Sequence, residues 1–266
     1  MSRRRQPDDG RRRASLAGVA VLAASVLPAP AARAADGTAS YAVLSVIGDR
    51  MEVITRHGVT GTSMDRNARQ ELPLQDDTFD VAAVRAAGRA IRERDPGARV
   101  ELFAPRDPKL YALQDQLADS DRQAESLAAS LREAVAQSGA SRIVLISKYR
   151  ADARVKVDEG SVGTGKLSGI GFYVDADYEA ADPARRTGYV GFFAPYAYLR
   201  ITLLDVATGR RLREEVTTDA RPYGTERASR TTSAWDALTA TQKVAALREV
   251  VEGAVQQAVT QVLAPR

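Results

Sequence analysis

The amino-acid sequence predicts a mixed α/β (α+β) fold, with helices packed on a single mixed β-sheet and antiparallel hairpins in the C-terminal half. Between residues 40 and 150, short apolar runs typical of buried strands alternate with helical patterns. The turn sequence Ala207-Thr208-Gly209 joins two strand-like segments, 199–203 and 212–216. The chain ends in an amphipathic helix whose apolar residues recur at helical spacing from Val244 to Val262. These helical stripes need a sheet face to pack against.

The N-terminal elements follow from apolar patterns and turn residues. Residues 43–47 are apolar on both faces, as in a buried strand, and Gly48-Asp49 can turn the chain into a second short strand. Residues 57–79 are polar and aperiodic, and we expect them to form a loop. Asp80 fits the N-cap of a helix, which the sequence Asp-Pro-Gly at 95–97 ends.

The middle of the chain carries the clearest strand. Residues 98–105 form a short strand, and apolar spacing over 110–135 predicts one long helix, or two helices broken near Ser120. Residues 142–149 contain an uninterrupted apolar run, which is the strongest strand pattern in the chain. Alternating valines at 155 and 157 extend this strand toward a glycine-rich segment, after which another strand-like run follows.

Residues 1–34 have the pattern of a cleaved export signal. Six arginines precede an apolar run at 16–27, which is shorter than the roughly 20 residues that a membrane-spanning helix needs. Ala32 and Ala34 occupy the −3 and −1 positions of an A-x-A cleavage site. We therefore expect a periplasmic or secreted protein, exported by the Sec or the twin-arginine route. Its mature part, 35–266, is expected to be one domain without a transmembrane segment.

Charge and cysteine content narrow the classes of function. The whole chain has a net charge of +4, but residues 1–34 contain seven arginines and two aspartates. The remaining residues therefore carry 31 basic and 32 acidic groups, so the basic character belongs to the export signal. No nucleic-acid partner is expected. The absence of cysteine excludes disulfides, thiol nucleophiles, cysteine metal sites and a lipid-attachment cysteine.

The segment 160–171, GSVGTGKLSGIG, resembles a nucleotide-binding loop over its first seven positions. Such a loop needs Ser or Thr after its lysine, to bind Mg²⁺, and a helix whose N-terminus faces the phosphates. Here Leu167 follows Lys166, and a strand-like aromatic run comes next. The sequence therefore predicts a connection between two strands, with no nucleotide and no other cofactor.

Two further stretches are candidates for catalysis or metal binding. Asp175, Asp177 and Glu179 occupy the first, third and fifth positions of a calcium loop, but the required glycine and glutamate are missing. A looser Ca²⁺ site or a solvated loop tip are the alternatives. His57 is the only histidine, which excludes multi-histidine metal sites and favours a surface residue over a catalytic base.

Aromatic residues are concentrated in one stretch of the chain. Five of them fall between positions 189 and 198, among glycines and a proline. Packing in the core is the ordinary explanation for such residues. Aromatics also concentrate where proteins bind one another, so this stretch is our candidate contact surface. The candidate residues are Phe172, Tyr173, Tyr189, Phe192, Phe193 and Tyr196.

Two motifs carry a resemblance to a group of bacterial envelope domains. In those domains, a helix that ends in a small residue leads into a strand, and a later strand carries L-x-D-x-x-T-G into a hairpin. Residues 138–149 and the set Leu203 or Leu204, Asp205, Thr208 and Gly209 match these patterns. The group includes the periplasmic domain of the curli secretion channel, the N-terminal domain of the Tol propeller protein and lipoproteins that activate cell-wall synthases. The resemblance implies a sheet domain that binds other envelope proteins without catalysis.

These observations favour an exported, non-catalytic envelope protein that acts by contact with another protein or a cell-wall component. The alternative is an exported hydrolase that uses a carboxylate pair, with or without a divalent cation. Contact function predicts an exposed apolar patch around 189–198 and no deep polar pocket. Hydrolysis predicts an acidic pair in a concave site.

Overall fold

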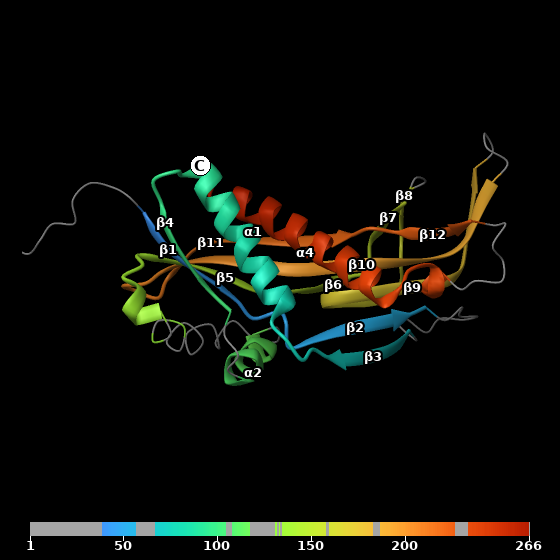
Figure 1. Cartoon of the computed structure of the whole chain (residues 1–266), viewed down its shortest axis with the longest axis horizontal. Coiled ribbons are helices and arrows are strands. Elements are labelled where there is room, and N and C mark those ends of the chain that lie inside the picture. Colours follow the sequence, from blue (N-terminus) through green and yellow to red (C-terminus); the bar gives the residue numbers. More distant parts are fainter. Residues whose placement is uncertain are drawn as a thin grey trace, which may run out of the picture. The chain divides into compact units, whose positions relative to one another are not determined.

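A computed structural model describes residues 39–56, 67–104, 108–117, 131, 133, 135–157, 160–182, 187–226 and 234–265. All of them belong to one compact unit, Thr38–Arg266. The fold is mixed α/β, with one large mixed sheet and a separate two-stranded sheet, which confirms the predicted fold class (Figure 1). The strands are β1 Ser40–Ser45, β2 Arg50–Thr55, β3 Ala68–Pro73, β4 Arg99–Phe103, β5 Arg142–Lys148, β6 Arg150–Asp152, β7 Val155–Val157, β8 Gly160–Val162, β9 Lys166–Asp182, β10 Thr187–Asp205, β11 Arg211–Ala220 and β12 Tyr223–Glu226. The helices are α1 Thr78–Arg94, α2 Pro108–Leu117 and α4 Ala240–Val262, with short 3-10 turns η2 Ala136–Ser138 and η4 Ala234–Ala237.

The large sheet consists of two halves that share the long strand β10. Residues 187–198 of β10 pair with β9, and residues 199–205 pair with β5 on the same edge. Strand β1 pairs in parallel with β5, and β2 pairs in parallel with β9. The chain therefore runs twice from one half into the other, once from β1 to β2 and once from β5 to β9. Strands β11 and β12 pair with the opposite edge of β10.

One face of the sheet packs against α1 and α4. These helices lie next to each other in Figure 1 and contact one another. Their buried alanines, valines and leucines meet side chains such as Val43, Val144 and Ile201, which point to the same face. The start of α4 is fixed by a capping box in which Thr239 and Gln242 exchange side chain to backbone hydrogen bonds.

The opposite face has two separate covers. Leu110 of α2, with Leu131 and Val135, packs on the β1–β5 half of the sheet. On the β2–β9 half, Val155 of β7, from the segment between β5 and β9, and Leu167 at the start of β9 pack on aromatic side chains of β9 and β10. No helix in the described residues is long and apolar enough to cross a membrane.

Most predicted elements are confirmed, and four expectations need correction. The segment expected to be a loop, 57–79, contains strand β3, and its first residues, 57–66, lie outside the described part. Helix α1 begins at Thr78, two residues before Asp80. The valines at 155 and 157 belong to β7, which pairs with β8 in a separate two-stranded sheet and does not extend β5. The acidic stretch 175–182 is strand and no loop tip. The expected break near Ser120 falls outside the described residues.

Candidate binding site at the step between β1 and β2

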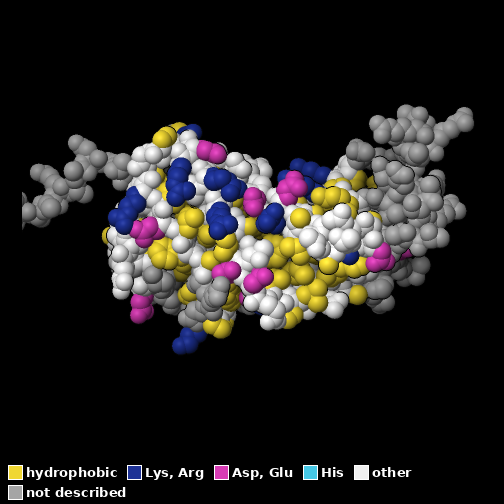
Figure 2. All heavy atoms as spheres, in the orientation of Figure 1, with side chains coloured by type: hydrophobic (Ala, Val, Ile, Leu, Met, Phe, Trp, Pro, Cys, Tyr) yellow, Lys and Arg dark blue, Asp and Glu magenta, His cyan; other side chains and the backbone are white. Residues whose placement is uncertain are grey.

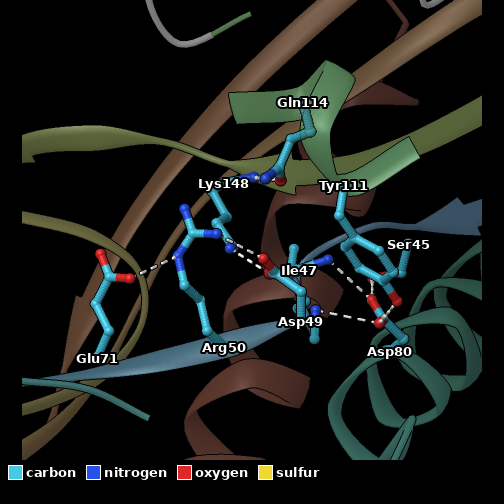
Figure 3. Close-up of polar contacts among 10 residues, drawn as sticks. Ser45, Ile47, Asp49, Arg50, Glu71, Asp80, Tyr111, Gln114 and Lys148 are labelled. Carbon is cyan, nitrogen blue, oxygen red and sulfur yellow. Dashed lines mark hydrogen bonds and ion pairs between the residues drawn. The ribbon is translucent and has the colours of Figure 1, made fainter. Parts of the chain in front are cut away.

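The step from β1 to β2 leaves a notch at the outer side of the sheet. Strand β4 pairs with β1 as far as Leu44, and β3 pairs with β2 from Arg50 onward. Between these points, residues 46–49 have no strand beside them on that side within the described ranges. The first turn of α1 and the side chains of α2 meet at this notch, although the two helices pack on opposite faces of the sheet (Figure 3).

Asp80 in the first turn of α1 accepts four hydrogen bonds at the notch. Its Oδ1 accepts from the Ser45 hydroxyl at 2.6 Å and from the Ile47 backbone N–H at 2.9 Å. Its Oδ2 accepts from the Gly48 backbone N–H at 3.1 Å and from the Tyr111 hydroxyl at 2.6 Å. An ionised carboxylate only accepts hydrogen bonds, and here all four neighbours can donate. Asp80 thereby ties the β1–β2 loop to both helices (Figure 3).

Burial dominates the ionisation of this group. Removal from water raises the pKa of Asp80 above its ordinary value of 3.8, and the hydrogen bonds from Ser45, Tyr111 and the loop backbone offset this only in part. Burial, together with the hydrogen bond to Asp80, also raises the pKa of Tyr111. The phenol therefore stays protonated and remains a donor to the carboxylate at neutral pH.

Gly48 is required by the close approach of Asp80. A β-carbon at position 48 would lie 2.4 Å from Oδ2 and 3.0 Å from Cγ of Asp80. The first distance is too short for a non-bonded contact and the second is unusually tight, and four hydrogen bonds hold the carboxylate in place. The glycine that the sequence marks as a turn residue is therefore also the residue that lets α1 reach the loop.

A second polar network lies beside Asp80. The buried ammonium of Lys148 forms an ion pair with Oδ1 of Asp49, and Nη1 of Arg50 donates to Oδ2 of the same carboxylate at 2.7 Å. Nε of Arg50 lies 3.6 Å from Oε2 of Glu71. Gln114 of α2 accepts from the Lys148 backbone N–H at 2.8 Å. This network joins the β1–β2 step to the end of β5 (Figure 3).

An open hollow of about 600 Å³ lies against these two networks. It is lined by residues 48–50 of the loop, residues 74–77 before α1, and Pro108, Tyr111 and Ala112 of α2. Its ionisable lining consists of three aspartates and two further groups, Arg50 and Tyr111. The lining is therefore negative overall. For a contact protein the sequence predicts no deep polar pocket, and it gives no indication of this open, charged hollow.

The hollow occupies a position that favours ligand binding. The carboxyl ends of the parallel strands β1 and β4 lead into its lining segments, and the N-terminus of α1 lies beside it. In open α/β sheets, ligands bind in crevices outside the carboxyl ends of the strands. Position, concavity and charged side chains therefore coincide at this hollow.

The aromatic residues predicted as a contact surface are core residues instead. Phe172, Tyr173, Phe192, Phe193 and Tyr196 are each at most 2% exposed. They lie on β9 and β10, alternately under η4 and under the β6–β8 excursion. Tyr189 belongs to β10, but its side chain is outside the described part.

The expectation of an exposed patch is therefore wrong for these five side chains. Period-2 alternation sends them to both faces of the hairpin, and each face has its own cover. A partner can reach them only if one of these covers moves away. Their role in partner contact stays a prediction.

The glycine-rich segment joins strands, as predicted. It begins with β8, and β9 starts at Lys166 without any intervening helix. The Lys166 ammonium forms an ion pair with Asp152 at 2.6 Å, on the neighbouring strand β6. The lysine that a phosphate site would require is therefore paired within the protein.

Asp175, the first acidic residue of the stretch, is engaged within the protein. Asp175 is 1% exposed, and its Oδ2 accepts from Nη1 of Arg56 at 2.8 Å. Its Oδ1 accepts from the Asp177 backbone N–H at 3.1 Å. The side chain of Glu179 and the whole of His57 lie outside the described residues. Where the structure is described, no three His, Cys, Asp or Glu side chains are grouped to hold a metal ion.

Comparison with known proteins leaves the sequence without a family. No protein-family model matches it, and no curated protein matches it. Among solved structures, the PelC dodecamer from Paraburkholderia phytofirmans is similar at TM-score 0.34 and 11% identity, over 86% of this chain and 90% of that chain. A Xanthomonas campestris protein of family DUF330 is similar at TM-score 0.34 and 13% identity, over 85% of this chain and 81% of that chain.

Likenesses at this level carry no conclusion about function. Neither structure is one of the three envelope proteins that the sequence motifs resemble, and that resemblance stays a prediction.

Proposed function

We propose that this protein is exported into the bacterial envelope and works there by binding another protein or a cell-wall component, without catalysing a reaction. Support for export comes from the arginine-rich start, the apolar run at 16–27 and the Ala32/Ala34 pair, all within residues that the structure does not describe.

The observation that carries the binding role is the hollow at the β1–β2 step. Its floor is fixed by Asp80 and by the Asp49–Lys148 ion pair, so its shape is set before any partner arrives. Rigid walls reduce the entropy lost on binding. The negative lining favours a partner segment that presents a basic side chain.

The engagement of Asp80 and Asp49 favours binding over catalysis at these two carboxylates. Both oxygens of Asp80 hold donors, and both oxygens of Asp49 hold cations. A general base needs an oxygen that can take a proton from a substrate within hydrogen-bond reach. These carboxylates can do so only by giving up contacts that hold the fold.

Site-specific photo-crosslinking in the native bacterium tests this proposal. A photoreactive residue replaces Gln75 or Ala112, both exposed side chains on the wall of the hollow. The control position is Gln257, an exposed side chain on α4. We expect discrete crosslinked species from positions 75 and 112 in the envelope fraction and none from 257. Crosslinks at all three positions, or at none, would overturn the binding role of the hollow.

Mass spectrometry of the protein isolated from the same fraction tests export separately. We expect a mature N-terminus at Ala35, immediately after the predicted cleavage site. Recovery of the uncleaved chain from the cytoplasm would contradict export, whatever the crosslinking result.

A further inference from the structure

The exposed side of α1 carries a row of arginines. Arg85, Arg89 and Arg92 are exposed and fall at helical positions i, i+4 and i+7, so they lie along one side of the helix. Arg94 and Arg99 are exposed close to the end of this row. Figure 2 shows Lys and Arg side chains, with several Asp and Glu side chains among them, on the face that α1, β4 and α4 form. The row is made of arginine alone, without lysine.

Few of these cations are neutralised by the protein itself. Arg89 pairs with Glu252 of α4 at 3.0 Å, and Arg99 pairs with Glu101. Arg92 donates to a backbone carbonyl, that of Val100 at 3.4 Å, which carries no net charge. Within the described residues, Arg85 forms no ion pair. The helix face therefore presents positive charge to solvent.

An exposed apolar side chain lies within this arginine row. Leu102 of β4 is 38% exposed, and its methyl groups are the nearest side-chain atoms to Gly88 of α1. The Arg92 guanidinium lies next to the same glycine. Because Gly88 has no side chain, Leu102 packs directly on α1 and remains partly exposed beside Arg92.

We propose that this α1–β4 face docks on the surface of an anionic phospholipid bilayer. Guanidinium groups bind phosphate with two parallel hydrogen bonds, and each basic side chain near an anionic bilayer contributes about 1 kcal/mol. The apolar Leu102 can enter the head-group layer beside them. Burial of this side chain adds to binding at a bilayer, whereas a soluble polyanion offers no apolar layer for it to enter. The inference goes beyond the proposed function, because this face is separate from the hollow and needs no protein partner.

Single-cysteine labelling locates the docking face, because the chain contains no cysteine of its own. The mature protein, residues 35–266, carries an environment-sensitive fluorophore at Leu102→Cys, so that the arginines of the export signal cannot bind the vesicles. The control carries it at Val216→Cys, which is similarly exposed at 41%. Val216 pairs with Arg200, so the two side chains lie on the same face of the sheet. Arg200 points away from the face on which its neighbour Leu199 packs against the helices, and Val216 therefore also points away from α1.

Vesicles of phosphatidylcholine with about one third phosphatidylglycerol are the probe, and pure phosphatidylcholine vesicles are the reference. We expect a blue shift of the label at 102 with the anionic vesicles only. The label at 216 should not respond. A silent label at 102, or an equal response at both positions, would overturn the proposal.

Charge-neutralised variants test the arginines directly. For the Arg85→Gln/Arg89→Gln/Arg92→Gln triple variant, we expect the anionic vesicle concentration that gives half of the response at position 102 to rise by about 100-fold. This factor follows from the combined contribution of three basic residues. The matched control removes three exposed cations near the β6–β7 turn: Arg150, Arg154 and Lys156. This control should bind within about twofold of the parent chain.

Equal binding by the two triple variants would overturn the proposal. Circular dichroism of both variants checks that they are folded. Heparin that binds the arginine row without lipid, as tightly as the vesicles do, would identify an anionic polymer as the partner and would also overturn the proposal.

Discussion

Tyr196 and Tyr198 are neighbours on β10 whose hydroxyl groups should contribute to stability with opposite signs. Tyr196 is fully buried, and its hydroxyl has no hydrogen-bond partner within the described residues. Tyr198 accepts from the Arg154 backbone N–H at 2.9 Å and donates to the Asp152 carbonyl at 3.3 Å. A buried polar group without a partner costs about 1–3 kcal/mol, whereas each satisfied hydrogen bond contributes about 0.5–1.5 kcal/mol.

Tyr196→Phe is therefore expected to raise the free energy of unfolding by about 1 kcal/mol, because it removes an unpaired hydroxyl and keeps the ring. Tyr198→Phe is expected to lower the free energy of unfolding by about 1–2 kcal/mol, because it leaves the Arg154 N–H and the Asp152 carbonyl without this partner. For a domain of this size, 1 kcal/mol corresponds to a change in Tm of about 2–4 °C.

Urea unfolding measures both effects through a single fluorophore. Trp235 is the only tryptophan, and its ring packs edge-on against Phe172 at 5.3 Å, so its emission should report loss of the core. The midpoint should rise for Tyr196→Phe and fall for Tyr198→Phe, with an unchanged slope. If Tyr196→Phe destabilises the protein as much as Tyr198→Phe does, the Tyr196 hydroxyl is bonded and the reasoning fails.

Three further perturbations have defined outcomes. The raised pKa of Asp80 means that the folded chain keeps this proton to higher pH than the unfolded chain does, so the contribution of Asp80 is complete below pH 3.8 and is lost as pH rises through the folded pKa. Asp80→Asn abolishes this titration, so the variant should lower the free energy of unfolding by about 1–3 kcal/mol, and by less at neutral pH than near pH 3.8. A loss of stability that grows with pH would refute this prediction. Glu93→Gln, an exposed position on the same helix, is the control. Gly171→Ala would place its β-carbon 2.0 Å from a backbone oxygen of β2, so it should lower the free energy of urea unfolding by more than 3 kcal/mol. Gly139→Ala meets no atom within 4 Å and should lower it by about 1–2 kcal/mol, because position 139 has a positive φ. Equal losses of stability would contradict the predicted contact at position 171. Thr239→Ala removes the capping box of α4 and should lower the Tm by an amount that corresponds to about 1 kcal/mol, while Thr239→Ser should restore it.

Elements with strong local patterns were predictable from the sequence. Strand β5 has an uninterrupted apolar run, because it is buried on both faces between β1 and β10. The seam of α4 has helical periodicity, because one side of the helix packs on the sheet. In the turn at Ala207-Thr208-Gly209, position 209 has a φ of 69°, a left-handed conformation that favours glycine. Strand β3 was missed because its residues are mostly exposed and polar, so no apolar alternation marks it.

The candidate site was less predictable, because its contacts are remote in sequence. Asp80 has a residue type typical of helix caps but lies in the first turn of α1, and its side chain accepts from a loop more than 30 residues earlier and from α2 about 30 residues later. Lys148 is the last residue of β5, within the strongest predicted strand, but nothing local indicates its ion pair with Asp49, 99 residues away. A buried strand followed by Gly48-Asp49 is the one local signal that could have drawn attention to this loop.

The same step in the sheet explains both the hollow and the burial of the aromatic residues. Along β10, the neighbouring strand changes from β9 to β5 between Tyr198 and Leu199. In the next position of the sheet, the strand changes from β2 to β1 close to the same point. The chain therefore leaves the sheet between β1 and β2 and again between β5 and β9. The outer interruption is a four-residue loop, too short to cover the edge of the sheet, so Asp80 and α2 close it and leave a hollow beside them. The inner interruption is long enough to form β6, β7 and β8, which fold over the tyrosines of β9 and β10. The difference in length between these two connections therefore decides which side of the step is open to a partner and which side becomes core.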